Sequence, residues 1–250
     1  MTDFSGTVAL VTGAARGIGL AIAAELIRRG GSVCITARDE RELSAAVSRL
    51  DPQGQQRAVG SAGSADDETH QRATVDRVME RFGRLDFLVN NVGINPWYGP
   101  MMEIDLRVVR KVLDVNVVST LAWTQLAWQA WLGEQGGAVL NIASIGGLRV
   151  GAPVGAYNVS KAAVIHLTRQ LAQEMAPRVR VNAIAPAMVK TEFSRKLWDG
   201  REDRLQKRYP LNRLGIPEDI SRAAAFLLSP EASWITGEIL TIDGGVTTRS

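Results

Sequence analysis

The chain begins with a short apolar run that stops at a glycine-rich turn and is followed by a helical pattern. Residues 7–12 read Thr-Val-Ala-Leu-Val-Thr, a β-branched run typical of a buried strand. Glycines follow at Gly13, Gly17 and Gly19, and the apolar residues of Ile18–Arg29 recur at helical spacing. This unit constrains the fold more than any other feature, because a strand, a glycine turn and a helix in this order predict the first layer pair of an α/β sheet.

The same alternation of strand and helix continues to the end of the chain. Apolar runs predict further strands at residues 32–36, 57–59, 87–89, 138–142, 179–184 and 239–242. Helical spacing predicts helices at residues 40–50, 66–82, 106–132, 157–175 and 217–228, with Gly133 and Gly136-Gly137 ending the third of these. The longest segment expected to be irregular is 185–214. About seven strands alternating with helices predict an α/β fold with a doubly wound parallel sheet covered on both faces.

Length and composition predict one domain over residues 1–250. A chain of 250 residues with 46% hydrophobic composition is long enough for one well-packed core. With 29 basic and 26 acidic side chains the formal net charge is only +3, which does not predict a nucleic-acid-binding protein. The two histidines, His70 and His166, have no companions at metal-ligand spacing, so no metal site is expected.

The single cysteine and the start of the chain bear on the compartment. Cys34 excludes an intramolecular disulfide, and its place in an apolar predicted strand predicts a buried thiol in a reducing compartment. The first residues lack a basic region followed by an apolar run, and no stretch of about 18 uninterrupted apolar residues occurs. We therefore expect a cytoplasmic protein without a membrane partner.

The glycine-rich turn predicts a binding site for phosphate. Glycines between a strand and a helix let the backbone approach an anion, while the helix N-terminus presents its free N–H groups. The spacing is not Gly-x-Gly-x-x-Gly, and the turn ends in Gly-Ile-Gly where an ATPase P-loop requires Gly-Lys followed by Ser or Thr. The pattern thus excludes an ATPase loop and leaves a turn that either binds a pyrophosphate or only reverses the chain.

A tyrosine and a lysine stand one helical turn apart at Tyr157 and Lys161. A phenol with a reference pKa of about 10 transfers protons poorly at neutral pH unless a cation stabilises the phenolate, and Lys161 supplies that cation. Ser144 ends a predicted strand and could hydrogen-bond a substrate oxygen beside the Tyr157 hydroxyl. This pattern fits a proton-transfer site or a surface helix that simply carries a tyrosine and a lysine, and the rest of the chain has to decide between them.

Taken together, the motifs resemble those of the short-chain dehydrogenase/reductase family. The resemblance covers nearly the whole chain. It rests on Thr-Gly-x-x-x-Gly-x-Gly at 12–19, Asn-Asn-x-Gly at 90–93, Asn116, Ser144, Tyr157-x-x-x-Lys161, Pro186, Thr191 and the ending at 235–245. It implies a Rossmann-type single domain with strand order 3-2-1-4-5-6-7.

The resemblance also assigns roles to individual residues. Tyr157 would be the general acid in ketone reduction, Lys161 would lower its pKa and hold the nicotinamide ribose, and Ser144 would steady the substrate oxygen. Asn116 would hold a water of a proton relay, unless it only caps a kink in its helix. The implied cofactor-binding residues are Gly13, Arg16, Gly17, Ile18, Gly19, Arg38, Asn90, Gly93, Tyr157, Lys161, Pro186, Val189 and Thr191.

The end of the second strand favours NADP over NAD. Arg38 follows that strand, and Arg16 could reach the same 2′-phosphate. Asp39 is one position too late for the acidic residue of NAD enzymes, although a shifted turn would leave NAD possible. Three positions depart from the family pattern, namely Val92, Gly63 and Ala187. The second of these leaves the adenine contact unassigned.

The family's substrate loop corresponds to residues 187–213. It combines apolar and aromatic side chains with eight basic ones against four acidic ones, so an acyl-carrier protein or coenzyme A is a possible partner. Trp97 and Tyr98 are further candidates to line the pocket. Trp123, Trp128 and Trp131 are expected to pack between helices or subunits, since the resemblance implies a homotetramer that uses the helices at 106–132 and 157–175.

These observations predict an oxidoreductase that transfers a hydride between NADP(H) and a carbonyl or secondary alcohol. The nearest functional neighbours are the family's 3-oxoacyl-thioester reductases. An NAD-dependent alcohol, polyol or steroid dehydrogenase is the alternative within the family. A non-catalytic NADP-binding regulator or scaffold is the alternative outside it, and the intact Ser144, Tyr157 and Lys161 argue against that alternative.

Overall fold

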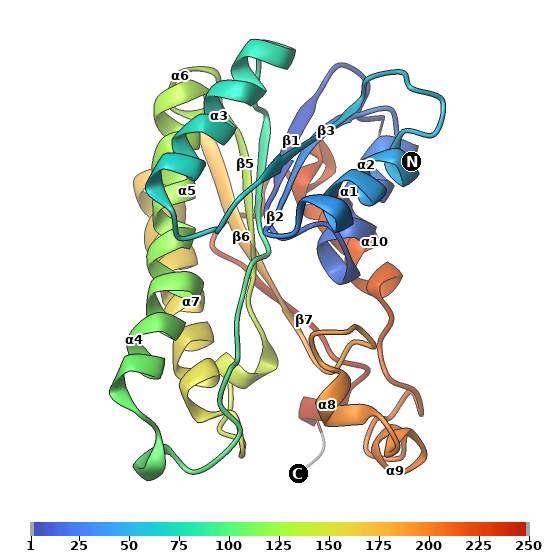
Figure 1. The fold of residues 1–250 in the computed structure, drawn as a ribbon, viewed down its shortest axis with the longest axis vertical. Coiled ribbons are helices and arrows are strands. Elements are labelled where there is room, and N and C mark those ends of the chain that lie inside the picture. The colour runs from blue at the N-terminus through green and yellow to red at the C-terminus, as the bar shows by residue number, and fades with distance from the viewer. Residues whose placement is uncertain (1–2, 249–250) are drawn as a thin grey trace.

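Seven parallel strands form the centre of the protein in the computed structural model, which describes residues 3–248 (Figure 1). The strands are β1 (Val8–Val11), β2 (Ser32–Ala37), β3 (Ala58–Ala62), β4 (Phe87–Asn90), β5 (Gly137–Ile142), β6 (Val179–Pro186) and β7 (Ile239–Ile242). Their order in the sheet is β3-β2-β1-β4-β5-β6-β7, and every neighbouring pair is parallel. The predicted Rossmann-type sheet and its strand order are therefore confirmed.

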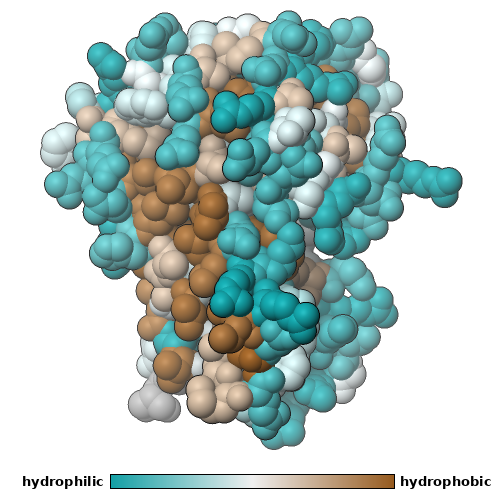
Figure 2. All heavy atoms as spheres, turned by 60° about the vertical axis from the view of Figure 1, so that its left-hand side comes forward, coloured by the Kyte–Doolittle hydropathy of each residue, from teal (hydrophilic) through white to brown (hydrophobic). Residues whose placement is uncertain are grey.

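Helices cover both faces of this sheet (Figure 1). One face carries α1 (Gly17–Arg28), α2 (Glu40–Leu50) and α10 (Pro217–Leu228). The other carries α3 (Glu68–Phe82), α4 (Leu106–Leu113), α5 (Ser119–Ala127), α6 (Gly133–Gln135) and α7 (Gly155–Glu174). Two short helices, α8 (Arg195–Trp198) and α9 (Glu202–Gln206), follow β6. Figure 2 shows that apolar side chains gather on the outer surface of the second layer.

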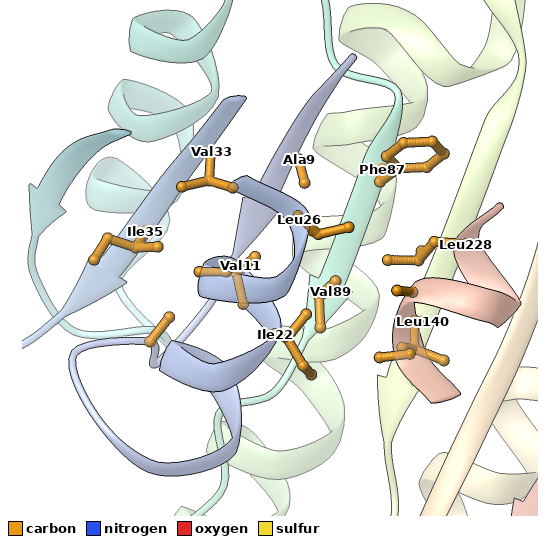
Figure 3. Close-up of a cluster of buried hydrophobic side chains, with 14 of the residues drawn as sticks. Ala9, Val11, Ile22, Leu26, Val33, Ile35, Phe87, Val89, Leu140 and Leu228 are labelled. Atoms are coloured by element: carbon orange, nitrogen blue, oxygen red, sulfur yellow. The ribbon is translucent and has the colours of Figure 1, made fainter. Parts of the chain in front are cut away.

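The two cores follow from the alternation of side chains along each strand. In β1, Ala9 and Val11 pack toward α1 and α10, whereas Val8 and Leu10 pack toward the opposite layer. Figure 3 shows the first of these clusters, in which Ile22 and Leu26 of α1 face the sheet. Because successive side chains of a strand point to opposite faces, a strand covered on both sides is apolar throughout. All four residues of β1 are accordingly buried.

Most predicted elements agree with the structure to within a few residues, but two predictions were wrong in part. The helix expected at 106–132 runs on to Gln135 and includes two wide π-turns, Asp114–Val118 and Trp128–Leu132. Gly133 is helical, and the chain leaves the helix at Gly136, whose φ of +78° suits glycine. The segment expected to be irregular contains α8 and α9, which are too short to show a helical period.

Cys34 is buried and Trp123 packs in the interior of the helical layer, as the sequence predicted. Cys34 is fully buried, and desolvation raises the pKa of its thiol to about 12. Trp123 is buried between α3 and α5 and donates its indole N–H to the Ala65 carbonyl at 3.0 Å. No group of residues suited to hold a metal occurs within residues 3–248. None of the described helices is long and apolar enough to cross a membrane.

His70 explains the absence of a side chain at Gly63. A Cβ at Gly63 would lie only 2.3 Å from Cγ of His70, so the imidazole ring fills the space that a larger residue would need. The ring packs edge-on against Trp123 with centroids 5.9 Å apart. The position that lacks the acidic residue common in the family is therefore closed by a histidine from α3.

We predict that Gly63→Ala lowers the free energy of unfolding by about 1–3 kcal/mol, because it overpacks this contact. In a His70→Ala background the same substitution should cost less than about 1 kcal/mol, since the ring is gone. Urea unfolding of the four proteins of this double-mutant cycle measures both costs. An equal cost of Gly63→Ala in the two backgrounds would contradict the contact.

Candidate active site

The glycine-rich turn joins β1 to α1 at the point where the strand order reverses. Gly13 and Gly17 have φ values of +62° and +60°, which side chains other than glycine rarely adopt. The amides of Gly13 and Ala14 bond to Thr36 at the end of β2. Arg16, the residue directly before α1, gives no side-chain hydrogen bond to cap the helix. The first amides of α1 are therefore open to an anion.

The residue after β4 holds this turn in place, an asparagine of the 90–93 motif that is not among the predicted cofactor-binding residues. Asn91 donates from Nδ2 to the carbonyls of Thr12 and Gly13, both at 2.9 Å. Its neighbour Asn90 points into the interior, where it donates to Asn141 at 2.9 Å and Thr124 at 3.2 Å. A contribution of Asn90 to cofactor binding can therefore come only from its backbone.

Val92, the first departure from the family pattern, packs against the glycine turn. A Cβ at Gly13 would lie 2.7 Å from Val92 Cγ2, so the valine methyl takes up the space beside this glycine. The larger side chain is accommodated within the turn and leaves the backbone of the end of β4 in place. Ala187, the third departure, continues the pairing of β6 with β7, since its amide donates to the carbonyl of Ile242 at 3.0 Å.

Lys161 is buried between the ends of β4 and β5. Its side chain reaches from α7 to donate to the carbonyl of Ile142, the last residue of β5, at 2.7 Å. A Cβ at Gly93 would lie 3.3 Å from Nζ, so the absence of a side chain there makes room for the ammonium. The lysine is only 3% exposed, and desolvation lowers its pKa to about 8. Since an ammonium has three protons, two remain for other acceptors.

Asn116 ties the loop after β4 to α7. It lies in the first π-turn, is fully buried, and exchanges hydrogen bonds with both backbone groups of Ile94 at 2.7 Å and 3.0 Å. Its Nδ2 also donates to Ser160 at 2.9 Å, and Ser160 donates to the carbonyl of Tyr157 at 2.7 Å. The side chain is thus fully used in positioning the neighbours of Tyr157 and Lys161.

Tyr157 lies in the first turn of α7, close to Ser144. Burial is the main cause that raises the pKa of its phenol to about 12, the nearby Ser144 hydroxyl opposes the shift, and Tyr98 adds to it. The Lys161 ammonium lies 5.7 Å from the centre of the tyrosine ring. Ser144 follows β5 by two residues, and its Oγ accepts the amide of Gly146 at 3.0 Å. The structure thus brings together the three residues of the predicted proton-transfer site.

The segment after β6 closes over this site. Phe193 packs against Tyr157 with ring centres 5.9 Å apart, and the Lys196 ammonium lies 5.8 Å from the ring centre of Tyr98. Thr191 faces the glycine turn, because a Cβ at Gly17 would lie 3.3 Å from its Cγ2. Pro186 ends β6, and Val189 pairs with Gly215 in an isolated bridge. The predicted loop therefore borders both the glycine turn and the tyrosine.

Comparison with known proteins decides the family. The family model described as Enoyl-(Acyl carrier protein) reductase matches residues 13–247. A Caenorhabditis elegans protein named Dehydrogenase/reductase SDR family member 4 is 39% identical over 98% of this chain and 97% of its own. The chain belongs to the short-chain dehydrogenase/reductase family. The human protein of the same name is 37% identical over 97% of this chain and 88% of its own.

Solved structures of this family have the same fold. A Brucella melitensis structure described as a short-chain dehydrogenase/reductase of the glucose/ribitol dehydrogenase type superimposes with a TM-score of 0.90 at 33% identity, covering 98% of each chain. A Mycobacterium marinum short-chain dehydrogenase/reductase superimposes with a TM-score of 0.93 at 31% identity, covering 99% of this chain and 98% of its own. The protein is an oxidoreductase that uses NAD(P) to act on CH–OH or C=O groups, as predicted.

The residues of the site fit the NAD(P) of this family. The uncapped start of α1 suits a pyrophosphate, and the Lys161 ammonium suits ribose hydroxyls. The glycines of the turn lie so close to Asn91, Val92 and Thr191 that added Cβ atoms would crowd the crevice. When bound, the nicotinamide supplies or accepts the hydride. The chain itself has to position the substrate oxygen and manage its proton.

The burial of Lys161 should make stability depend on pH. In the unfolded chain its pKa returns toward 10.5, so between about pH 8 and 10.5 the unfolded state binds more protons at this lysine, and the contribution of Lys161 to stability rises with pH. Relative to Lys161→Met, we predict that the wild-type protein gains about 1–2 kcal/mol between pH 7 and 10. Urea unfolding of both proteins across this range measures the gain, and a difference that stays constant with pH would contradict it.

Proposed function

We propose that the protein is an NADP(H)-dependent reductase of ketones, or dehydrogenase of the corresponding secondary alcohols, with an apolar group beside the reacting carbon. The observation that supports it most is the position of Tyr157 beside Ser144 and Lys161, at the carboxyl ends of β4 and β5. In parallel α/β sheets this edge, next to the reversal of strand order, is where ligands bind.

Each of the three side chains has a separate task. The Tyr157 hydroxyl donates its proton to the substrate oxygen as a ketone is reduced, and the phenolate takes the proton back as an alcohol is oxidised. The Ser144 hydroxyl hydrogen-bonds the same oxygen and holds it beside the phenol. The Lys161 ammonium, 5.7 Å from the ring centre, favours the phenolate by its charge. Asn116 contributes by fixing the backbone around Tyr157. Its backbone carbonyl, which accepts the Thr120 hydroxyl at 3.0 Å, would hold the water of the relay with its second lone pair.

The pKa of Tyr157 determines how the rates of alcohol oxidation and ketone reduction change with pH. With a pKa near 12 the phenol is protonated at neutral pH and ready to act as an acid. Alcohol oxidation requires the phenolate, so its rate should rise as the pH increases toward that pKa. Ketone reduction should lose activity at the same alkaline end, since the proton donor is then lost.

We predict that Tyr157→Phe retains the fold and cofactor binding but loses turnover by about 10²–10⁴-fold, because the acid is removed while the apolar ring stays. Steady-state rates with a ketone substrate measure the loss. Phe193→Tyr is a useful control, because it changes the ring that packs against Tyr157 and keeps the Tyr157 hydroxyl. Near-normal turnover of the Tyr157→Phe protein would overturn the proposed role.

The choice of NADP rests on the residues that follow β2. Arg38 is exposed directly after this strand, where a 2′-phosphate would need a cation. Asp39 instead caps α2, since one of its carboxylate oxygens accepts the amides of Arg41 and Glu42 at 2.9 Å each. This carboxylate is thereby directed toward the helix, which argues against the ribose contact typical of NAD enzymes.

We predict a higher kcat/KM with NADPH than with NADH at equal concentrations, by about tenfold, the factor expected from one charge-assisted contact. Initial rates with a panel of ketones and acyl thioesters measure this ratio and the substrate preference together. A clear preference for NADH would reverse the proposed cofactor.

The substrate is proposed to be apolar next to its carbonyl, because aromatic residues border the tyrosine. Tyr98 acts on the pKa of Tyr157, and Phe193 contacts its ring. The acyl chain of a 3-oxoacyl thioester would satisfy this requirement. The name of the matching family model refers to an acyl carrier protein, while those of some structural neighbours refer to sugars and sugar acids, so thioesters and polyols both belong in the panel.

The basic side chains of the substrate loop support a phosphate-bearing thioester only in part. Lys190 pairs with Glu202, and Arg195 pairs with Glu192 and Asp199. Within residues 3–248 no ion pair involves the exposed side chains of Arg201, Arg204 and Arg208. These three arginines are the proposed contact for coenzyme A or an acyl-carrier protein.

A homotetramer remains our proposal for the assembly. Apolar side chains gather on the surface of the α4, α5 and α7 layer (Figure 2). Val118, just before α5, and Val159 of α7 are 57% and 56% exposed, which is unusual for β-branched apolar residues on two neighbouring helices. Light scattering of the purified protein, with a mass four times that of one chain as the expected result, tests this proposal.

A further inference from the structure

Arg16, one of the two arginines assigned to the cofactor's 2′-phosphate, is already engaged by a carboxylate. Its Nη1 lies 2.8 Å from one carboxylate oxygen of Glu42 and 3.0 Å from the other. Both side chains are at the surface, with 58% and 50% of their areas exposed. Arg16 directly precedes α1, whereas Glu42 belongs to the first turn of α2, so the ion pair joins the starts of two helices across the end of β2.

The surrounding backbone fixes this meeting point. Gly13 and Ala14 bond to Thr36 of β2, at 3.2 Å and 2.9 Å, and so bring the glycine turn against the end of that strand. Asp39 holds the amide of Glu42 at 2.9 Å, which sets the start of α2. The pair therefore lies between the glycine turn and the helix that follows Arg38.

A carboxylate at this place weakens the binding of NADP but not that of NAD. It occupies the guanidinium that a 2′-phosphate would use, and it adds a negative charge that repels a phosphate dianion. A ribose 2′-hydroxyl carries no charge, so it does not need the guanidinium and is not repelled by the carboxylate. Removing the carboxylate should thus strengthen binding of a 2′-phosphate and leave a 2′-hydroxyl nearly unaffected.

We propose that Glu42 is a specificity-determining residue of the cofactor site, because its ion pair with Arg16 restrains the affinity for a 2′-phosphate and so keeps NAD usable. This inference rests on the proposed NADP site at Arg38. It assigns to a surface glutamate of α2 the balance between the two cofactors.

Binding of two cofactor fragments tests the inference without any measurement of turnover. Calorimetry at low salt compares 2′,5′-ADP, which carries the 2′-phosphate, with 5′-AMP, which lacks it. For Glu42→Gln we expect the Kd of 2′,5′-ADP to fall about fivefold, and the Kd of 5′-AMP to change less than about twofold. The fivefold gain should shrink as salt is added, since exposed charges are screened.

Glu40→Gln is the matched control, because it removes the same charge from the same turn of α2. No ion pair involves Glu40 in the part of the chain that the structure describes. This variant should change the Kd of 2′,5′-ADP less than about twofold. An equal gain in Glu40→Gln, or no gain or a loss in Glu42→Gln, would overturn the role of the ion pair.

Arg38→Ala separates this inference from the proposed cofactor. If the NADP site is correct, the variant weakens 2′,5′-ADP by about tenfold and leaves 5′-AMP nearly unchanged. A normal loss in Arg38→Ala together with no change in Glu42→Gln rejects only the role of Glu42. Unchanged 2′,5′-ADP binding in both variants rejects the NADP site and the inference with it.

Discussion

The hydrogen bond from Lys161 Nζ to the carbonyl of Ile142 connects the helix that carries the site to the sheet that supports it. It requires a lysine to be buried against the end of β5, and the missing side chain of Gly93 makes that burial possible. Desolvation of the ammonium is costly, which lowers its pKa to about 8. The electrostatics of the proposed reaction therefore depend on where the sheet allows this one side chain to lie.

Backbone positions around the lysine are held by side chains that do not themselves transfer protons. Asn116 joins Ile94 to Ser160, and Ser160 joins that unit to the carbonyl of Tyr157. On the other side of the crevice Asn91 fixes the glycine turn. Asn116 uses both ends of its side-chain amide in these bonds, and Asn91 uses its Nδ2 group. The geometry of the site is thus held by contacts within the protein itself, and such preorganisation lowers the entropic cost of binding.

Much of the fold and of the candidate site could be predicted from the sequence, because the patterns that indicate them are local or belong to the family's ordered set of motifs. Glycines between a strand and a helix, and Tyr157 one turn before Lys161, follow from short-range geometry, and the resemblance of ordered motifs fixed the strand order. The long helix was mispredicted at Gly133, since a glycine is tolerated in a helix that packing stabilises. Helices α8 and α9 were missed because each spans too few residues to show a period.

The sequence by itself determined the parallel sheet and the family and predicted the residues that transfer the proton, because each depends on residue type and spacing along the chain. Only the tertiary structure decided that Asn90 faces the interior, that His70 fills the space at Gly63, and that Glu42 reaches Arg16. Each of these is a contact between residues far apart in the chain or on different elements. Which side chain fills a given space depends on how the helices and strands pack, and the spacing of residues along the chain does not indicate that packing.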